Sequence, residues 1–390
     1  MKILITTDWY EPVINGVVTS VKILTSELRR SGHDVKILTL SRTCRSYVKD
    51  DVFYIGSVSV GKIYPEARFK LPVSEKYIQE LLDWQPDIIH SQCEFSTFFL
   101  AKKIASELNI PIVHTYHTIY EDYTHYFSPR KKWGKEIVQI ITKRLSGQVC
   151  GMIAPSEKIR KILEGYQVDC PLWVVPSGIH ISQYEIEEAD NWRERIRAKY
   201  SIGPETKVLL YVGRLAKEKN VEELISYQTE AREYGTVLMI VGDGPYRNTL
   251  EEHVKKLHLE DCVVFTGMVP QAEVGKYYQA GDLFVSASTS ETQGMTYGEA
   301  LASGLPLLCR RDDCLDGVIV EGNNGWQYEN AEEFLTYLTG WEDKDEDEKH
   351  RMCQNAKESA GLFSAEGFCK KVEQIYEQKA KKRTERTDAA

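Results

Sequence analysis

Apolar residues along the chain alternate between short continuous runs and longer stretches in which they recur every three or four positions. The run Lys2–Thr6 is typical of a buried strand, and the spacing of apolar residues over 17–28 is typical of a helix. Gly32 can end that helix, and Asp34–Leu40 is the next apolar run. The pattern predicts a strand, a helix and a parallel strand at the start of the chain.

The same alternation continues in two sets, one reaching about residue 175 and one running from 207 to 309. Strand-like runs bounded by turn signals alternate with helical patterns, which is typical of parallel α/β sheets. The first set has further expected strands at 87–90, 112–114, 151–154 and 172–175, with helices at 95–108 and 131–145. The second set has expected strands at 207–213, 236–241, 262–265, 283–286 and 305–309.

The two sets predict an α/β chain with two Rossmann-like domains. Residues 1–180 form the N-terminal domain and 181–365 the C-terminal one, and the polar stretch Glu185–Lys199 separates the two sheet sets. The active site is expected in the cleft between the domains, outside the carboxyl ends of the strands. A Lys- and Glu-rich helix is expected at 366–382, and a frayed tail at 383–390.

Composition is that of an ordinary globular protein. The 390 residues are 42% hydrophobic and 27% charged, and this length allows two domains with separate cores. The formal net charge of −9 argues against a nucleic-acid partner. Residues 1–145 nevertheless hold 20 Lys and Arg against 16 Asp and Glu, whereas the remainder holds 29 against 42. The basic surplus therefore lies in the N-terminal half.

The nine cysteines are scattered and form no C-x-x-C pair. Their odd number and spacing favour a reduced, cytoplasmic chain over a disulfide framework or a zinc site. The N-terminal apolar stretch is too short for a signal peptide, and no window approaches the roughly 20 apolar residues of a membrane span. We expect a cytoplasmic protein, at most peripheral to a membrane. No cluster with metal-ligand spacing is visible, so no obligatory metal is expected.

Candidate phosphate-binding residues follow the first strand of each predicted domain. Gly16 precedes a helix N-terminus whose unpaired N–H groups can bind phosphate, although a single such glycine is most often a turn residue. Arg214 and Lys219 lie on the strand-to-helix loop of the second domain and could neutralise a diphosphate leaving group. The alternative is a pair of solvated surface cations. A full G-x-G-x-x-G is absent, which disfavours a dinucleotide-dependent dehydrogenase.

The stretch Ser290–Glu299, SETQGMTYGE, follows another short apolar run. A helix that begins after Gly294 would direct the N–H groups of 295–297 toward phosphate or sugar oxygens. Glu291 would lie before this helix and Glu299 in its first turns, where carboxylates can accept hydrogen bonds from neighbouring hydroxyls. The alternative is that Glu299 complements the helix dipole and Glu291 caps the helix.

Taken in order, these elements resemble the retaining nucleotide-sugar glycosyltransferases of family four, which have the GT-B fold. The motifs are the N-terminal glycine loop, G-R-x(4)-K, and E-x(7)-E followed by Ala-Leu-Ala-Ser-Gly-Leu-Pro. The resemblance implies that the 366–382 helix packs back on the N-terminal domain, that Glu299 holds the ribose and that Glu291 holds the donor sugar. The other donor-binding residues are then Gly16, Arg214 and Lys219 at the diphosphate, the backbone of Gly267, Met268 and Val269 at the base, and Gly294, Met295 and Thr296 at the helix start.

The segment His114–Tyr126 is the best indication of the acceptor. It resembles the H-T-x-Y-E-D-Y-x-H-Y segment of bacterial diacylglycerol glucosyltransferases, and ETQGMTY is also similar to that subgroup. The resemblance places His117 beside the transferred sugar. A run of aromatics and histidines can equally be core packing, which we prefer for His114 because it lies within the strand. The expected acceptor-binding residues are Tyr120, Glu121, Tyr123, His125 and Tyr126.

The segment from Arg130 to Arg144 combines cations, a tryptophan and an apolar helical face. Such a segment can lie on an anionic membrane surface, with each cation contributing about 1 kcal/mol near the lipid. An ordinary domain helix with a solvated basic end fits the segment equally well, and the basic surplus of the N-terminal half favours the membrane. The expected membrane-contact residues are Arg130, Lys131, Lys132, Trp133 and Lys135.

The leading hypothesis is transfer of a hexose to diacylglycerol with retention, with glucose from UDP-glucose as the preferred donor. The product would be an α-linked membrane glycolipid made on the inner face of the cell membrane. One alternative is a glycosyltransferase for a polysaccharide or glycan precursor, and a more distant one is a nucleotide-sugar-binding protein without turnover. The residues assigned to catalysis are His117, Arg214, Lys219 and Glu291.

Overall fold

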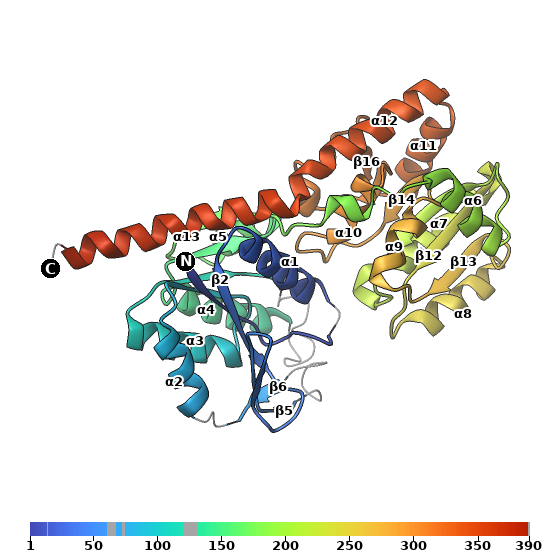
Figure 1. The fold of residues 1–390 in the computed structure, drawn as a ribbon. Coiled ribbons are helices and arrows are strands. Elements are labelled where there is room, and N and C mark those ends of the chain that lie inside the picture. The colour runs from blue at the N-terminus through green and yellow to red at the C-terminus, as the bar shows by residue number, and fades with distance from the viewer. Residues whose placement is uncertain (14, 61–67, 72–74, 120–130, 389–390) are drawn as a thin grey trace. The chain divides into compact units, whose positions relative to one another are not determined.

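A computed structural model describes residues 1–13, 15–60, 68–71, 75–119 and 131–388 of the chain (Figure 1). The chain divides into two compact units. Unit 1 consists of residues 1–178 and 365–390, and unit 2 of residues 179–364. Unit 2 is thus continuous in sequence, whereas unit 1 is assembled from both ends of the chain.

Unit 1 is built on one eight-stranded sheet, in the order β10-β9-β8-β7-β1-β2-β4-β3. All neighbouring strands are parallel except β3 and β4, and Ile3 of β1 pairs with Val35 on one side and Ile88 on the other. The strand order reverses beside β1, and crevices at such reversals are where α/β proteins bind ligands. The strands are β1 (Lys2–Thr6), β2 (Asp34–Leu40), β3 (Tyr47–Lys49), β4 (Val52–Ile55), β7 (Ile88–Ser91), β8 (Ile112–Thr115), β9 (Gly151–Ala154) and β10 (Leu172–Val174).

Helices pack on this sheet because their inward faces are apolar, as in α1, where Val18, Val21, Leu24 and Leu28 are buried. A separate antiparallel hairpin of β5 (Ser57–Ser59) and β6 (Arg68–Lys70) adjoins α3, since the Lys70 N–H donates to Ser96 Oγ at 3.2 Å. The helices of unit 1 are α1 (Gly16–Arg30), α2 (Glu75–Trp84), α3 (Ser96–Leu108), α4 (Lys131–Ser146), α5 (Glu157–Gly165) and α13 (Ala365–Asp388).

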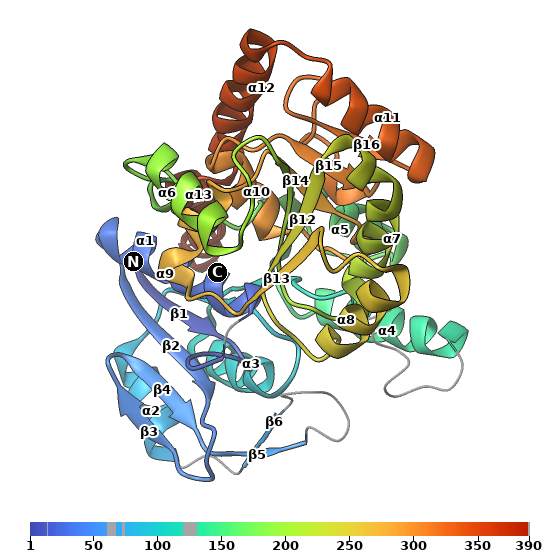
Figure 2. The same cartoon turned by 90° about the vertical axis from the view of Figure 1, so that its right-hand side faces the viewer.

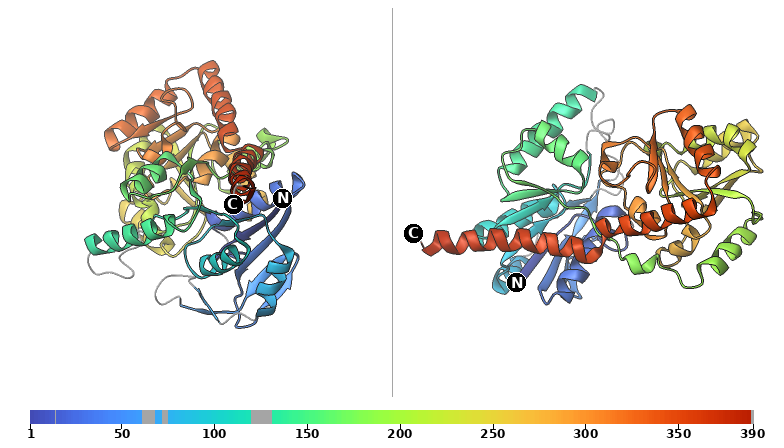
Figure 3. Two further views of the ribbon diagram at one scale, coloured as in Figure 1. Left: turned by 90° about the vertical axis from the view of Figure 1, so that its left-hand side faces the viewer. Right: turned by 90° about the horizontal axis from the view of Figure 1, so that it is seen from above.

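The C-terminal helix α13 is joined to the rest of unit 1 by buried and polar contacts. The Tyr376 hydroxyl lies 2.6 Å from His90 Nδ1 in the interior, and His33 Nε2 lies 2.9 Å from Glu373 Oε1. Figure 3 shows α13 nearly end-on at left and along its length at right. The helix continues to Asp388, through most of the stretch expected as a frayed tail, and its Lys-, Glu- and Arg-rich sequence favours this continuation.

Unit 2 has a six-stranded, entirely parallel sheet in the order β13-β12-β11-β14-β15-β16, visible in Figure 2. Its strands are nearly continuous apolar runs, as expected for a sheet covered on both faces. They are β11 (Lys207–Val212), β12 (Thr236–Val241), β13 (Val263–Gly267), β14 (Leu283–Ser286), β15 (Leu307–Arg310) and β16 (Gly325–Tyr328). The helices are α6 (Ala189–Lys199), α7 (Val221–Ala231), α8 (Arg247–Leu257), α9 (Gln271–Tyr278), α10 (Met295–Ala302), α11 (Ala331–Glu342) and α12 (Glu346–Ser359).

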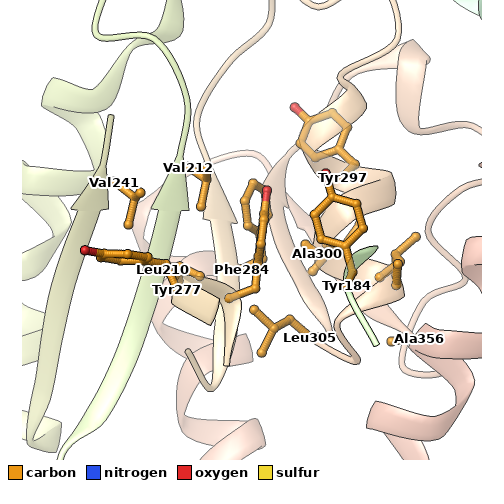
Figure 4. Close-up of a cluster of buried hydrophobic side chains, with 14 of the residues drawn as sticks. Tyr184, Leu210, Val212, Val241, Tyr277, Phe284, Tyr297, Ala300, Leu305 and Ala356 are labelled. Atoms are coloured by element: carbon orange, nitrogen blue, oxygen red, sulfur yellow. The ribbon is translucent and has the colours of Figure 1, made fainter. Parts of the chain in front are cut away.

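The core of unit 2 lies between the sheet and the helices that cover it. Figure 4 shows Phe284 of β14 near Tyr297 and Ala300 of α10, with Leu210, Val212 and Val241 further across the sheet. The ring centroids of Phe284 and Tyr297 lie 6.0 Å apart, so the core holds the start of α10 against the sheet. The polar stretch Glu185–Lys199, expected to separate the sheets, mostly forms α6. The polar composition of this stretch gave no apolar helical pattern, so the helix was not predicted. Arg197 holds it in place by donating a hydrogen bond to Asp282 at 2.7 Å.

Every strand expected from the apolar runs is present within one or two residues at its ends. Among the residues described, none of the helices combines the length and apolar character needed to cross a membrane.

Candidate active site

The SETQG loop and α10 form the first group of candidate residues, all in unit 2. Gly294 precedes α10 with φ of +73°, and a Cβ atom there would lie 2.3 Å from the Tyr297 ring. Only glycine fits this combination without strain. The Tyr297 N–H donates to the Gly294 carbonyl at 3.0 Å, so it is already occupied. The phosphate cradle expected from three amides therefore reduces to those of Met295 and Thr296.

Lys219 and Glu291 are brought together although they lie in separate loops. Lys219 Nζ donates to Glu291 Oε1 at 2.6 Å, and both side chains are about one-fifth exposed, at 21% and 18%. The Ser290 hydroxyl also donates to the backbone carbonyl of Glu218 at 3.1 Å, which is a second hydrogen bond between the two loops. The loops after β11 and β14 thus form one polar surface with a positive and a negative group in contact.

Arg214 lies on the same loop as Lys219 but has a different partner. Its guanidinium pairs with the Glu218 carboxylate, and its side chain is 56% exposed. A bound diphosphate would compete with Glu218 for this cation. The structure is thus compatible with both sequence interpretations of Arg214, the phosphate ligand and the solvated surface cation.

Glu299 is buried and held by tyrosines that sequence reasoning did not find. Tyr278 Oη donates to Glu299 Oε2 at 2.8 Å, and Tyr184 hydrogen-bonds to the same carboxylate. Burial raises the pKa of Glu299, while the tyrosine hydroxyls oppose that rise because they stabilise the carboxylate. Glu299 is therefore a fixed hydrogen-bond acceptor rather than a mobile surface acid.

The residues expected near the base lie at the end of β13. Gly267 has φ of +75°, and its carbonyl accepts from the Gly242 N–H at 3.0 Å. Met268 is 72% exposed, while Val269 packs on the core. The turn therefore presents a backbone edge and one apolar side chain to solvent.

In unit 1, Gly16 is the first residue of α1 rather than the residue before it. Asn15 precedes it and caps the helix, since Asn15 Oδ1 accepts from the Val18 N–H at 2.9 Å. The cap fixes the direction in which the chain enters α1 and occupies the Val18 N–H. The amides before Val18 lie at the helix N-terminus, which is where a phosphate would bind.

His117 lies just past β8 and is half-buried. Its Nε2 donates to Gln92 Oε1 at 2.7 Å, and Gln92 directly follows β7. Burial, reinforced by the neighbouring His114, lowers the pKa of His117 to about 3, so the ring is neutral at pH 7. His114 is fully buried, and its Nε2 lies 3.2 Å from Glu94 Oε1.

A cavity of about 250 Å³ opens beside the ends of β1 and β2. The buried Asp8 lies in its wall and accepts hydrogen bonds from the Ser96 and Thr97 N–H groups at 3.0 and 2.8 Å. Burial raises the pKa of Asp8 to about 6 in spite of these bonds. The lining residues are Asp8, Trp9, Tyr10, Glu11, Val13, Leu40, Arg42, Ser59 and Arg68.

Several predicted residues lie outside what the structure describes. These are the acceptor residues Tyr120, Glu121, Tyr123, His125 and Tyr126, the residue Arg130, and the side chains of Lys131, Lys132 and Trp133. Lys135 is described and is exposed on α4. Across the described ranges, no group of three or more His, Cys, Asp or Glu side chains is arranged to hold a metal ion.

Gln92, Glu94 and Asp8 are site residues that sequence reasoning missed. Each follows an apolar strand run, and the rule that ligands bind outside the carboxyl ends of parallel strands indicates such positions. Tyr184 and Tyr278 carried no such signal, because neither lies at a strand end.

Comparison with known proteins gives two family matches that together span most of the chain. Residues 14–183 match "Glycosyltransferase Family 4", and residues 193–359 match "Glycosyl transferases group 1". The alpha-monoglucosyldiacylglycerol synthase of Streptococcus pneumoniae is 37% identical over 385 residues, covering 96% of this chain and 85% of that protein. The alpha-monoglucosyldiacylglycerol synthase of Acholeplasma laidlawii is 32% identical, covering 96% of each chain.

Solved structures agree on the fold. Anabaena HepE in complex with UDP and glucose superposes with a TM-score of 0.75 at 17% identity, covering 97% of this chain and 100% of that one. The lipopolysaccharide glycosyltransferase WaaG superposes with a TM-score of 0.71 at 19% identity, covering 96% of this chain and 99% of that one. The predicted GT-B fold is confirmed. The two family matches and the near full-length relatives show that the chain belongs to glycosyltransferase family four.

Proposed function

We propose that the chain transfers glucose from UDP-glucose to the free hydroxyl of diacylglycerol with retention, giving an α-glucosyl-diacylglycerol. The observation that carries this proposal is the near full-length identity to two alpha-monoglucosyldiacylglycerol synthases. The matches cover 85% and 96% of those two proteins and 96% of this chain, so the similarity extends over both units of the chain rather than over one.

The donor would be held by unit 2. Glu299, fixed by Tyr278 and Tyr184, would accept hydrogen bonds from the ribose hydroxyls. Glu291 would bind hydroxyls of the sugar, and the Met295 and Thr296 amides would bind the diphosphate at the start of α10. The Gly267–Val269 turn supplies a backbone edge for the base.

Transfer breaks the bond between the anomeric carbon and the diphosphate oxygen and forms one to the glycerol oxygen. The departing diphosphate takes up the hydroxyl proton on the same face of the sugar, which preserves the anomeric configuration. Lys219 and Arg214 would stabilise the growing charge on the diphosphate. The contact between Lys219 and Glu291 supports this role, because it puts the cation beside the carboxylate that would hold the sugar.

Peripheral membrane contact would bring the protein to its lipid substrate. The helix α4 has a buried stripe of Val138, Thr142 and Leu145, yet Ile137, Ile140 and Ile141 are 46%, 65% and 56% exposed. Exposed Lys143 and Arg144 adjoin these isoleucines. An exposed apolar stripe flanked by cations is suited to an anionic lipid surface.

The test is product analysis with purified protein. UDP-glucose and UDP-galactose are offered separately with dioleoylglycerol in vesicles or with soluble glycans, and products are identified by mass spectrometry and proton NMR. The proposal expects a glucosyl-diacylglycerol whose anomeric proton coupling shows the α configuration. Transfer only to glycans, a β-linked product, or no transfer would contradict it.

A further inference from the structure

His90, His114 and His117 lie near the carboxyl ends of β7 and β8, and each has a different partner. His90 lies between Tyr376 Oη at 2.6 Å and Thr115 Oγ1 at 2.7 Å, deep in the interior. His114 has the Glu94 carboxylate, and His117 has the Gln92 amide. His117 is the only one of these three that is not fully buried.

A carboxylate and an amide have different effects on an imidazole. The oxygen of either group can accept a hydrogen bond from a ring N–H, which fixes the orientation of the ring and its tautomer. A carboxylate also favours the charged ring, whereas a neutral amide does not. At 2.7 Å from His117 Nε2, the Gln92 oxygen orients the ring without favouring its protonation.

Gln92 is itself well placed to hold a ring in position. It is 2% exposed, and its backbone N–H donates to the Thr6 carbonyl at 2.8 Å, which ties it to the end of β1. Its Nε2 is buried without a hydrogen-bond partner among the residues described. The contact with His117 is thus the one side-chain hydrogen bond of Gln92 among the described residues.

The geometry points to Gln92 as a positioning residue that holds His117 with its proton on Nε2 and leaves Nδ1 as a hydrogen-bond acceptor for a substrate hydroxyl. The inference rests on the proposed function and on the family resemblance, which places His117 beside the transferred sugar. A neutral ring can accept a hydrogen bond from a sugar or glycerol hydroxyl, whereas an imidazolium can only donate. Gln92 therefore acts on the reaction through His117.

The experiment uses Gln92→Glu and Gln92→Leu, with transfer from UDP-glucose to dioleoylglycerol measured from pH 5.5 to 9. Gln92→Glu keeps the acceptor oxygen but adds a charge that raises the pKa of His117. We expect that titration of His117 causes no change in the wild-type rate between pH 5.5 and 9. Gln92→Glu should lose about ten-fold per pH unit below its new pKa and regain activity at high pH. Gln92→Leu, without an acceptor, should lose about 10²-fold at every pH.

Other titratable groups could shift a pH profile and must be held constant. Among the described residues these are His114 and His90 on the neighbouring strands, Glu94 bound to His114, and Asp8, whose pKa of about 6 lies within the tested range. All four are unchanged in both variants. Gln79→Glu makes the same chemical change on the exposed face of α2 in the same unit, and its profile should match the wild type.

Ring ¹⁵N shifts of labelled histidine give a readout that needs no substrate. The chain has nine histidines, and the signal lost in His117→Asn identifies the relevant one. We expect the Nε2–H tautomer in the wild type and imidazolium in Gln92→Glu at pH 6. An Nδ1–H tautomer, or a folded Gln92→Glu with an unchanged pH profile, would overturn the inference. Failure of the proposed function would instead appear as absence of lipid product from the wild type.

Discussion

At the scale of residues, the candidate site depends on pairings between loops. Lys219 and Glu291 are paired at 2.6 Å although they are 72 positions apart, and His117 is paired with Gln92 across 25 positions. The sequence could predict that charged and polar residues stand at strand ends, because apolar runs mark those ends. It could not predict which of them meet, since partners are set by how the strands are ordered in the sheet. The tyrosines on Glu299 were missed because neither lies at a strand end.

Lys219→Ala should lower the rate of transfer by about 10²- to 10³-fold, because the ammonium contributes most when the diphosphate gains charge. The unfolding free energy should change by less than about 1 kcal/mol, as expected for a partly exposed ion pair. Steady-state kinetics and denaturant unfolding measure the two effects. Lys217→Ala, an exposed neighbour on the same loop, is the control and should leave both unchanged. Equal losses of stability and activity would count against a role in leaving-group stabilisation.

His117→Gln should change how stability depends on pH. The folded-state pKa of His117 is lowered to about 3 from 6.5, so the stability it contributes is present above pH 6.5 and is lost as pH falls toward 3. At pH 5 the wild type should have lost about 2 kcal/mol through this group relative to pH 7.5. Unfolding curves at the two pH values should show a smaller loss in the variant. An identical pH dependence would mean that His117 is not neutral in the folded protein.

At the scale of elements, short stretches of sequence carry most of the fold. Most strands of the two sheets follow from continuous apolar runs, and α1 follows from its helical spacing, so these were predictable. The sheet strands β4 and β16 were not among the strands expected from the sequence. The short strands β3, β5 and β6 were also missed, because their sequences YVK, SVS and RFK mix polar and apolar residues and form no continuous apolar run. α6 was missed because its mean composition is polar and its contact with Asp282 is made by an arginine rather than by an apolar residue.

Gly294→Ala should destabilise unit 2 more than a substitution at an ordinary positive-φ glycine. Gly235 is the matched control, because its φ is +71° but a Cβ atom there has no neighbour within 4 Å. We expect about 1 kcal/mol for Gly235→Ala and a further 1 to 3 kcal/mol for Gly294→Ala, where the Cβ meets the Tyr297 ring. Thermal unfolding and the KM for UDP-glucose report the effects, and KM should rise only for Gly294→Ala. Equal effects at both glycines would show that the Tyr297 contact has no role.

Replacing Ile137, Ile140 and Ile141 together by Gln should abolish binding to anionic vesicles and leave the fold intact, because these side chains are exposed. Vesicle cosedimentation and circular dichroism measure the two properties. The matched control replaces Val320 and Leu362 of unit 2, which are 54% and 50% exposed, and should bind vesicles as the wild type does. Undiminished binding by the α4 variant would remove this helix from the membrane contact.

At the scale of the whole molecule, the two units differ in how the chain builds them. Unit 2 is one continuous segment, whereas unit 1 needs α13, whose Val372, Ile375 and Tyr376 are buried. The apolar pattern predicted most strands of the sheets in both units. It could not assign α13 to unit 1, because the contacts of that helix are made with residues about 300 positions earlier, such as Tyr376 with His90.

A fragment of residues 179–364 should fold on its own and bind UDP, because its core is complete within that segment. A fragment of residues 1–178 should not fold alone, since it lacks the side chains of α13 that fill its core. Circular dichroism and calorimetric titration with UDP test the first fragment, and light scattering tests the second. A cooperatively folded 1–178 fragment would show that α13 is dispensable for unit 1.

The discontinuous make-up of unit 1 also has a consequence for the order of events on the ribosome. Domains generally fold as units while the chain is being synthesised, but here the first unit to be translated is the last to be completed. Residues 1–178 must wait through the synthesis of all of unit 2 until α13 emerges. Nascent chains stalled soon after residue 364 should therefore show protease-resistant unit 2 and protease-sensitive unit 1. Throughout that interval, the N-terminal segment is the part of the chain that needs protection by chaperones.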